Sequence, residues 1–321
     1  MKIIISVNPK AGRSSSRLRA EELFERLQGK GYEAELLTDI DEVADKANRY
    51  FSDGELKVLI GVGGDGTAAT LVNRTTQGLP ITLLSAGTAN LISKHFRLGN
   101  TPAKLVDIVE NGHLVTLDAG KAVSFVEGKS VERIFLVMVS CGLDADIVNG
   151  VHSRREERYR SGHKKGAHIS YLSYIKPILH SLSTYKYPDM KVEQLIDGNY
   201  ITVDERTKWG FFFNLNRYGW GLPLAPFAKG NDGKIDHVLF RGGSCICGVF
   251  YTVLAQLYVH RFLPNSIAKL GQAEKYRITS ASNNTIPFQS DGDPGGCLPI
   301  EIEIVKDRFT LLVGKNTKRN A

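Results

Sequence analysis

Cysteine is scarce in this chain, with 4 residues in 321, and the 8 histidines show no ligand spacing. Cys245 and Cys247 lie two residues apart without a matching second pair, and Cys141 and Cys297 stand alone. Structural zinc sites need four ligands at defined spacings, so this pattern argues against one. We expect free, buried thiols, which suit a reducing compartment.

Long hydrophobic runs are also missing from the sequence. The N-terminal run from Ile3 to Val7 is too short for a signal peptide and ends at Asn8-Pro9. The longest apolar stretch elsewhere, residues 245–259, is shorter than the roughly 20 residues that span a bilayer, and Gln256 interrupts it. The sequence therefore predicts a cytoplasmic protein, with peripheral contact to a membrane left open.

The composition that remains is that of an ordinary globular protein, with 42% hydrophobic and 23% charged residues. The length fits two domains better than one. The formal net charge of +7 suits a nucleotide, a nucleic acid or an anionic membrane as partner, without choosing among them.

The first third of the chain alternates strand and helix patterns. Runs typical of strands lie at 3–7, 33–37, 58–62 and 81–84, and the first of them reads as a buried strand. Helical patterns between these runs predict a parallel sheet covered by helices, in which ligands bind beyond the carboxyl ends of the strands. Polar loops follow the first, third and fourth runs, and all three are expected at that edge.

Strand-like runs dominate after about residue 118. They lie at 121–126, 131–141, 191–196, 199–203, 209–215, 236–240, 275–280 and 300–313. Turn chemistry such as Asp197-Gly198-Asn199 and Asp232-Gly233 joins several of them. We predict an α/β protein with two domains. Residues 1–119 form a parallel three-layer nucleotide-binding domain, and residues 120–321 a mainly antiparallel β-sandwich whose last residues are free to pack back on the first domain.

The third strand leads straight into the segment Gly63-Gly64-Asp65-Gly66-Thr67, and a helical pattern follows. Glycines let backbone N–H groups approach phosphate oxygens, and the helix that follows offers its positive N-terminal end. We expect Thr67 to cap that helix and to donate to a phosphate. Because Asp65 is unfavourable beside an anion, it implies Mg²⁺ or a basic partner.

Two commoner phosphate-binding motifs do not fit. Gly128-Lys129-Ser130 lacks the earlier glycine of a P-loop, since position 123 is Val. The glycine spacing at 63–66 also differs from that of a dinucleotide-binding fingerprint.

Six short motifs, in order, resemble those of the diacylglycerol kinase catalytic-domain family, which includes bacterial lipid kinases, sphingosine kinases and ceramide kinases. The nucleotide-loop motifs are Asn8 to Gly12, Gly63 to Thr67 and Ser85 to Asn90. The motifs of the second domain are Gly142 to Ala145, Pro226 to Asp236 and Asp291 to Asp293. The resemblance covers nearly the whole chain.

The resemblance implies ATP as cofactor, bound at eight positions. These are Asn8, Thr38, Gly63, Gly64, Asp65, Gly66, Thr67 and Thr88. It also implies that Ser85 and Asn90 shape the third loop. The hydroxyl of Thr38 is equally compatible with an ordinary strand end.

The acidic motif at 291–293 resembles the segment that carries the family's catalytic base. Phosphoryl transfer needs a group near the γ-phosphate that accepts the proton of the attacking hydroxyl. The candidate catalytic residues are therefore Asp291 and Asp293, together with Asp65. The family usually has Glu at the last position, so the carboxylate here is about one methylene shorter, and either Asp291 or Asp293 fits the role of base. Without the other motifs, Asp-Gly-Asp-Pro-Gly-Gly is simply good turn chemistry.

The resemblance implies Mg²⁺ at two places. Asp118 matches an acidic position that the family uses with that of Asp65, and the segment of Lys229, Asp232 and Lys234 resembles a structural magnesium loop. A type I′ hairpin turn built on Asp232-Gly233 is the alternative for that segment. Leu91 departs from the Asp that many bacterial members carry there, which weakens the acidic network.

Charged and apolar surfaces bear on the partner. His152 to Lys165 contains six Arg and Lys residues, which would attract anionic lipid head groups or form a solvated loop. With Tyr159 as the one aromatic among them, nucleic-acid binding is disfavoured. Residues 245–262 would line an acyl-chain site or form a core helix. The oligomeric state is open, a homodimer included.

These features together predict an ATP-dependent lipid kinase that acts on diacylglycerol or a related lipid at the membrane surface. A non-catalytic nucleotide- or lipid-binding regulator is the alternative that Leu91 and Asp293 keep open. An NAD kinase shares the turn at 63–66 but is disfavoured by the loop at 87–90 and by the acidic motif.

Overall fold

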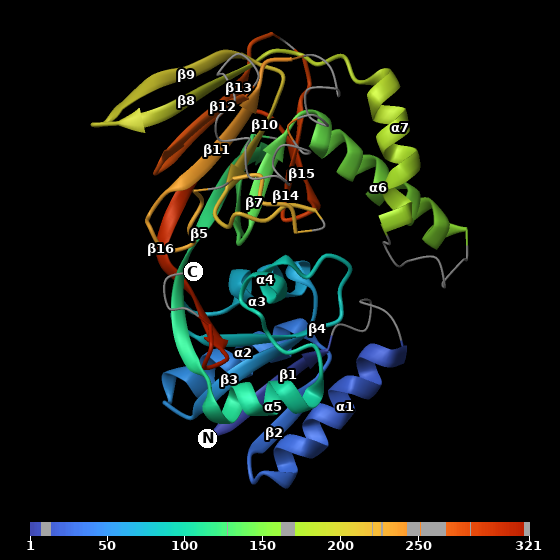
Figure 1. Cartoon of the computed structure of the whole chain (residues 1–321), viewed down its shortest axis with the longest axis vertical. Helices are drawn as coiled ribbons and strands as arrows, with labels where there is room; N and C mark the ends of the chain where they lie inside the picture. The colour runs from blue at the N-terminus through green and yellow to red at the C-terminus, as the bar shows by residue number, and fades with distance from the viewer. Residues whose placement is uncertain are drawn as a thin grey trace. The chain divides into compact units, whose positions relative to one another are not determined.

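The computed structural model describes residues 1–7, 14–126, 128–161, 171–219, 221–225, 227–242, 251, 268–282 and 284–317. The chain divides into two compact units: Met1–Asp118 with Lys306–Ala321, and Ala119–Val305. It passes from one unit to the other within two long strands, β5 (His113–Val126) and β16 (Ile300–Val313) (Figure 1).

The first unit is built on a parallel sheet. Its strands lie in the order β2 (Glu33–Leu37), β1 (Lys2–Val7), β3 (Leu56–Gly63), β4 (Pro80–Ser85) and the end of β16. Each neighbouring pair is parallel, so the carboxyl ends of β1 to β4 share one edge of the sheet. The expected strands are confirmed, each within two residues of its predicted ends.

Helices cover both faces of this sheet. The helices are α1 (Ser14–Gly29), α2 (Ile40–Ser52), α3 (Asp65–Arg74), the short α4 (Leu91–His95) and α5 (Pro102–Asn111). Leu23 of α1 and Leu105 of α5 share a core with Ile5 on one face. α2 packs on β1 and β3, and Ile4, whose side chain points to the other face, is fully buried. The predicted parallel three-layer arrangement is confirmed.

The second unit is an antiparallel β-sandwich. One sheet has the order β12 (Ala268–Ala273), β11 (Ile235–Phe240), β10 (Trp209–Phe213), β7 (Met138–Cys141), β14 (Pro287–Ser290) and β15 (Asp293–Cys297). The other contains the first part of β16, β13 (Lys275–Ser280), β8 (Met190–Ile196) and β9 (Asn199–Thr207), together with β5 and β6 (Lys129–Phe135). Phe212 and Phe288 of the first sheet share one core with Ile278 of the second. The predicted mainly antiparallel sandwich is confirmed.

Two helices lie side by side, and the first of them packs against β7, β14 and β15 of the sandwich (Figure 1). They are α6 (Leu143–Arg160) and α7 (Ile175–Thr184). The helices pack closely at Gly150, where a Cβ atom would lie 3.3 Å from Cβ of Pro177. The expectation of a solvated loop at 152–160 is therefore wrong, since these residues form the second half of α6. Residues 162–165 lie outside the described part of the chain.

The turn expected at Asp197-Gly198-Asn199 joins two antiparallel strands. Asp197 and Gly198 have φ of 49° and 80°, as a type I′ turn requires, and they join β8 to β9.

Cys141 is buried but Cys297 is exposed, so the expectation that all the thiols are buried is wrong. Cys245, Cys247 and most of the apolar stretch at 245–262 lie outside the described residues. Within the described ranges, no helix has the length and apolar character needed to cross a bilayer.

Candidate active-site residues

The turn after β3 forms the N-terminus of α3. The helix begins at Asp65 with Gly64 as its N-cap, and no side chain caps it. Thr67 lies within the first turn, where its N–H donates to the carbonyl oxygen of Gly64 at 3.0 Å. The expectation that Thr67 caps this helix is therefore wrong, because the helix starts two residues earlier. A Cβ atom on Gly63 would lie 2.0 Å from Oγ1 of Thr67, so this hydroxyl packs directly on the glycine.

The loop after β4 packs on that turn. A Cβ atom on Gly87 would lie 2.6 Å from Cα of Gly64, and the N–H of Ala86 donates to Gly63 O at 2.8 Å. Asn90 closes the loop, since its side chain accepts from the N–H of Gly87 at 3.0 Å and donates to its carbonyl at 2.8 Å. Asn90 itself has φ of 50°, a left-handed conformation that Asn tolerates well. Two of the three expected nucleotide loops thus form one packed surface.

The side chain of Asp65 links the start of α3 to the start of α4. Its two carboxylate oxygens accept the backbone N–H groups of Leu91 and Ile92, each at 2.9 Å. Burial raises the pKa of Asp65 above its usual value, and the N–H groups of Ile92 and Leu91 act in the opposite direction. Position 91 contributes a backbone N–H here, which a Leu provides as well as an Asp does.

The remaining nucleotide residues predicted from sequence lie at the same edge of the sheet. Thr38 follows β2 directly and is exposed, and Thr88 is half-buried in the loop after β4. The register of the parallel strands pairs Ser6 with Leu37 and Val7 with Val62. Asn8 would follow β1 at this edge, but it lies outside the described residues.

Asp118 is buried on β5 in the first unit. Its Oδ1 atom accepts the N–H of Asp307 at 3.0 Å. Among the residues that the structure describes, no three His, Cys, Asp or Glu side chains gather as a metal cluster. Magnesium held by one or two carboxylates, phosphates and water needs no such cluster, so the role of Asp118 stays a prediction.

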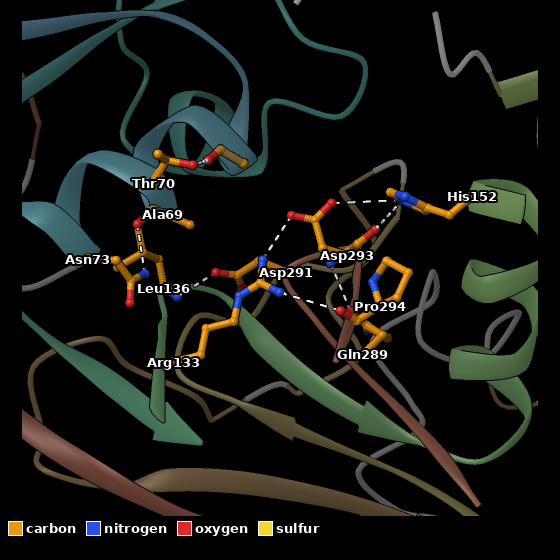
Figure 2. Close-up of polar contacts among 12 residues, drawn as sticks. Ala69, Thr70, Asn73, Arg133, Leu136, His152, Gln289, Asp291, Asp293 and Pro294 are labelled. Carbon is orange, nitrogen blue, oxygen red and sulfur yellow. Dashed lines mark hydrogen bonds and ion pairs between the residues drawn. The ribbon is translucent and has the colours of Figure 1, made fainter. Parts of the chain in front are cut away.

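The two acidic residues at 291–293 have different surroundings in the second unit (Figure 2). Asp291 has φ of 51°, and its carboxylate accepts three backbone N–H groups, those of Leu136 at 2.7 Å, Val137 at 2.9 Å and Met138 at 3.0 Å. Both of its oxygens therefore anchor the turn to the segment before β7.

Asp293 is accessible to solvent, with 42% of its side chain exposed. It begins β15, and its Oδ2 atom lies 2.9 Å from Nη2 of Arg133 on β6. Nε2 of His152 on α6 lies 3.7 Å from its other oxygen (Figure 2). The motif alone could not separate Asp291 from Asp293, and the structure shows that the two carboxylates have different partners.

Sequence reasoning did not single out Arg133, His152 or Gln289. Arg133 and His152 belong to segments far from 291–293 in the chain, so no spacing links them to the acidic motif. Gln289 Nε2 donates to Oδ2 of Asp144 at 3.1 Å, and Gln289 Oε1 accepts the N–H of Gly292 at 2.8 Å. Asp144, which belongs to the motif at 142–145, was the one residue of this cluster that the sequence pointed to. Burial raises the pKa of the Asp144 carboxyl.

The segment of Lys229 to Lys234 is a loop that leads into β11. The N–H of Lys234 donates to Oδ1 of Asp232 at 3.2 Å. Of the two turn residues only Gly233 has positive φ, at 72°, and β11 pairs with β10 and β12 rather than through this turn. The type I′ hairpin alternative is therefore wrong.

A buried carboxylate next to this loop fits a cation. Asp236 is 6% exposed, and its Oδ2 atom has no hydrogen-bond partner within the described ranges. Burial, and then the charge of Asp232, raise the pKa of Asp236 to about 7. An unpaired buried carboxylate is costly unless a cation or a proton neutralises it, so the donor set suits a hard divalent ion.

Comparison with known families now identifies the class of protein. The diacylglycerol kinase catalytic domain matches residues 2–122, and the YegS C-terminal NAD kinase beta sandwich-like domain matches residues 138–313. The chain belongs to the diacylglycerol kinase catalytic-domain family, as its motifs predicted.

Curated relatives agree with this assignment, and solved structures share the fold. The chain is 24% identical to a diacylglycerol kinase of Mycobacterium tuberculosis, over 97% of this chain and 94% of the relative. It is 21% identical to one of Staphylococcus carnosus, over 98% and 95%. A diacylglycerol kinase structure from Bacillus anthracis has a TM-score of 0.62 at 16% identity, covering 99% and 98% of the two chains. Yeast NADH kinase in complex with NADH has a TM-score of 0.52 at 12% identity, covering 99% and 84%.

Proposed function

We propose that this protein is an ATP-dependent lipid kinase that transfers the γ-phosphate of ATP to the hydroxyl group of diacylglycerol or a related lipid. The observation that carries the proposal is the placement of the Asp293 carboxylate. It is accessible, it lies next to Arg133 and His152, and the turn that presents it is fixed by Asp291. Membership in a kinase family, and the names of the relatives, support the same reaction class.

ATP binds to the first unit in this proposal. Gly63 to Thr67 supply backbone N–H groups at the start of α3, and the loop of Gly87 to Asn90 packs on them. Backbone donors at a helix N-terminus suit phosphate oxygens, and the missing side chains leave room for close approach. Asp65 acts on this surface by holding the start of α4, and the exposed Thr38 is suited to meet the adenosine at the same edge.

Asp293 serves as the general base. It accepts the proton of the lipid hydroxyl as that oxygen forms its bond to the γ-phosphorus. The bond from this phosphorus to the β–γ bridging oxygen breaks, and ADP leaves with the electron pair. Asp291 is unsuited to the role, because three backbone N–H groups occupy its oxygens.

Mg²⁺ would be held in two places. Asp118 is the candidate ligand for the ion that accompanies ATP, whose chemistry would be to neutralise charge that develops on the phosphates. The loop at Lys229, Asp232 and Lys234 would hold a structural ion, with the unpaired oxygen of Asp236 adding negative charge next to it.

The α6–α7 pair provides a surface suited to an anionic membrane. Four arginines occupy the last two turns of α6, at 154, 155, 158 and 160. On α7, Ile175 and Leu179 are 50% and 64% exposed and lie one helical turn apart. Cationic side chains beside exposed apolar ones are typical of peripheral membrane contacts.

The test is a side-by-side assay of the purified chain with labelled ATP, Mg²⁺, NAD and vesicles that carry diacylglycerol, a sphingoid base or a polyprenol. We expect transfer to a lipid hydroxyl and none to NAD, with transfer reduced to background in Asp293→Asn. Transfer to NAD alone would support an NAD kinase. Equal background counts for the wild type and Asp293→Asn on every acceptor would support a non-catalytic regulator.

A further inference from the structure

The Asp293 carboxylate is held between two basic side chains that come from different elements of the second unit. Nη2 of Arg133, on β6, lies 2.9 Å from Oδ2, and Nε2 of His152, on α6, lies 3.7 Å from Oδ1 (Figure 2). The side chains of Arg133 and His152 are 34% and 18% exposed, so both contacts are partly shielded from water. Ion pairs in such surroundings are screened less than those on an open surface.

The backbone of the turn is fixed by the same groups. His152 Nε2 lies 3.1 Å from the carbonyl oxygen of Gly292, and Nη1 of Arg133 lies 3.5 Å from that of Pro294. The N–H of Gly292 donates to Gln289 at 2.8 Å. Asp293 therefore has little freedom on its N-terminal side, and Arg133 and His152 restrain the carboxylate as well as the peptide groups on either side of it.

The short side chain of Asp makes this restraint necessary. A Glu can search for the substrate hydroxyl through an extra rotatable bond, whereas an Asp presents its carboxylate where the backbone places it. Errors of about 1 Å in the position of a reacting group can cost about 100-fold in rate. A cation that fixes one oxygen leaves the other to accept the proton.

We propose that Arg133 and His152 are positioning residues for the general base, Arg133 through its ion pair with Asp293 and His152 through Gly292 and Asp293. The inference rests on the proposed lipid kinase function. Among the residues that the structure describes, Arg133 and His152 form ion pairs with Asp293, and Asp291 lies two positions earlier in the chain. Asp291 is bound by backbone N–H groups, so Arg133 is the side chain that fixes the Asp293 carboxylate most directly.

The experiment uses the full chain with ATP, Mg²⁺ and phosphatidylglycerol vesicles that contain diacylglycerol. We expect Arg133→Gln to lower kcat by about 10- to 100-fold, with KM for ATP and for the lipid within about twofold of the wild type. Arg133→Lys keeps the charge and should recover part of the rate.

A matched control and a double variant separate positioning from general stability. Arg277→Gln removes another partly exposed arginine, whose Nη2 lies 2.9 Å from Glu301, and should leave kcat unchanged. In an Asp293→Asn background, Arg133→Gln should change the residual rate by less than about twofold, because its effect passes through the missing carboxylate. His152→Gln gives an independent test if Arg133→Gln lowers the melting temperature.

Three results would overturn the inference while leaving the proposed function intact. They are a wild-type kcat in both Arg133→Gln and His152→Gln, a rise in KM for the lipid alone, and an equal loss of rate with and without the Asp293 carboxylate. A wild type that phosphorylates no lipid would overturn the proposed function, and the assignment of Arg133 and His152 with it.

Discussion

Gly64 and Gly87 lie so close that a Cβ atom on Gly87 would be 2.6 Å from Cα of Gly64. This Cβ atom would clash with backbone atoms of Gly64, and it would also lie 2.8 Å from Oδ1 of Asn90. The two loops therefore share one surface in which a side chain at position 87 has no room.

Gly87→Ala should raise KM for ATP about tenfold or more, because the loop must move away from the start of α3 to admit the methyl group. ATP titrations with the purified variant measure the effect. Gly29→Ala is the matched control, since its Cβ atom would have no neighbour within 4 Å. An ATP affinity equal to that of the wild type in Gly87→Ala would show that ATP does not depend on the packing of these loops.

Substitution of Asp291 should affect mainly stability, and substitution of Asp293 mainly the rate of phosphoryl transfer. Asp291→Asn replaces one of two acceptor oxygens with a donor that faces backbone N–H groups, so it should lower the free energy of unfolding by about 1–3 kcal/mol. Asp293→Asn should leave the melting temperature close to that of the wild type and lower kcat by about 100-fold or more. Thermal melts and lipid kinase assays on the same preparations distinguish the two. The assignment fails if Asp291→Asn is as stable as the wild type and loses all activity.

Asp293→Glu provides the companion to these variants. The added methylene gives the Glu that the resemblance implies at this position, so measurable activity is expected. A complete loss would indicate that the protein has adapted its surroundings to the shorter side chain.

The layers of both units were predictable from the sequence because local patterns determine them. Strand patterns such as 33–37 and 275–280 coincide with β2 and β13, since alternating burial and β propensity act over the same few residues. The type I′ turn at Asp197-Gly198 is equally local, because few residues accept positive φ.

What the sequence could not predict depends on contacts between distant segments. The Asp65 carboxylate accepts the first two N–H groups of α4, and Arg133 reaches Asp293 across 160 positions of the chain. The hairpin expected at Asp232-Gly233 was wrong because the strand after it pairs elsewhere, which turn chemistry alone cannot reveal. The basic segment at 152–160 reads as loop because its many charges hide the helical pattern of α6.

The exposed apolar residues of α7 should matter for binding to membranes. Ile175→Ser combined with Leu179→Ser should weaken binding to phosphatidylglycerol vesicles about 30-fold or more, since each side chain contributes roughly 1–2 kcal/mol when buried in lipid. Vesicle co-sedimentation measures this change. Ile196→Ser with Ile201→Ser is the matched control, because these side chains are also exposed, at 40% and 47%, but lie on the β8–β9 hairpin. Equal losses in both double variants would argue against α7 as the contact.

Magnesium should stabilise the second unit in the absence of ATP. Binding at the loop before β11 would neutralise the repulsion between Asp232 and Asp236, so Mg²⁺ should raise the melting temperature by about 2–5 °C over an EDTA-treated sample. Asp232→Asn should remove most of this gain, whereas Asp45→Asn, at an exposed position of α2, should keep it. An identical gain in all three proteins would place the ion elsewhere.

A buried histidine makes the stability of the second unit dependent on pH. His237 is 3% exposed, and its Nδ1 atom lies 2.9 Å from the hydroxyl of Tyr276, which donates to the carbonyl of Ile235. Burial, and then the charge of Lys269, lower the pKa of His237 to about 4 from its usual 6.5. Between these values the unfolded chain binds a proton that the folded protein does not. Folding is therefore favoured fully above pH 6.5, and this contribution is lost as the pH falls towards 4.

The loss over this range should be up to about 3 kcal/mol for the wild type, measured as urea midpoints at several pH values. His237→Gln keeps a donor for Tyr276 and cannot take up the proton, so its stability should be lower at pH 7 but should change much less on acidification. His180→Gln, at an exposed position of α7, should keep the wild-type slope. If His237→Gln and the wild type lose stability in parallel as the pH falls, the acid sensitivity arises from other groups.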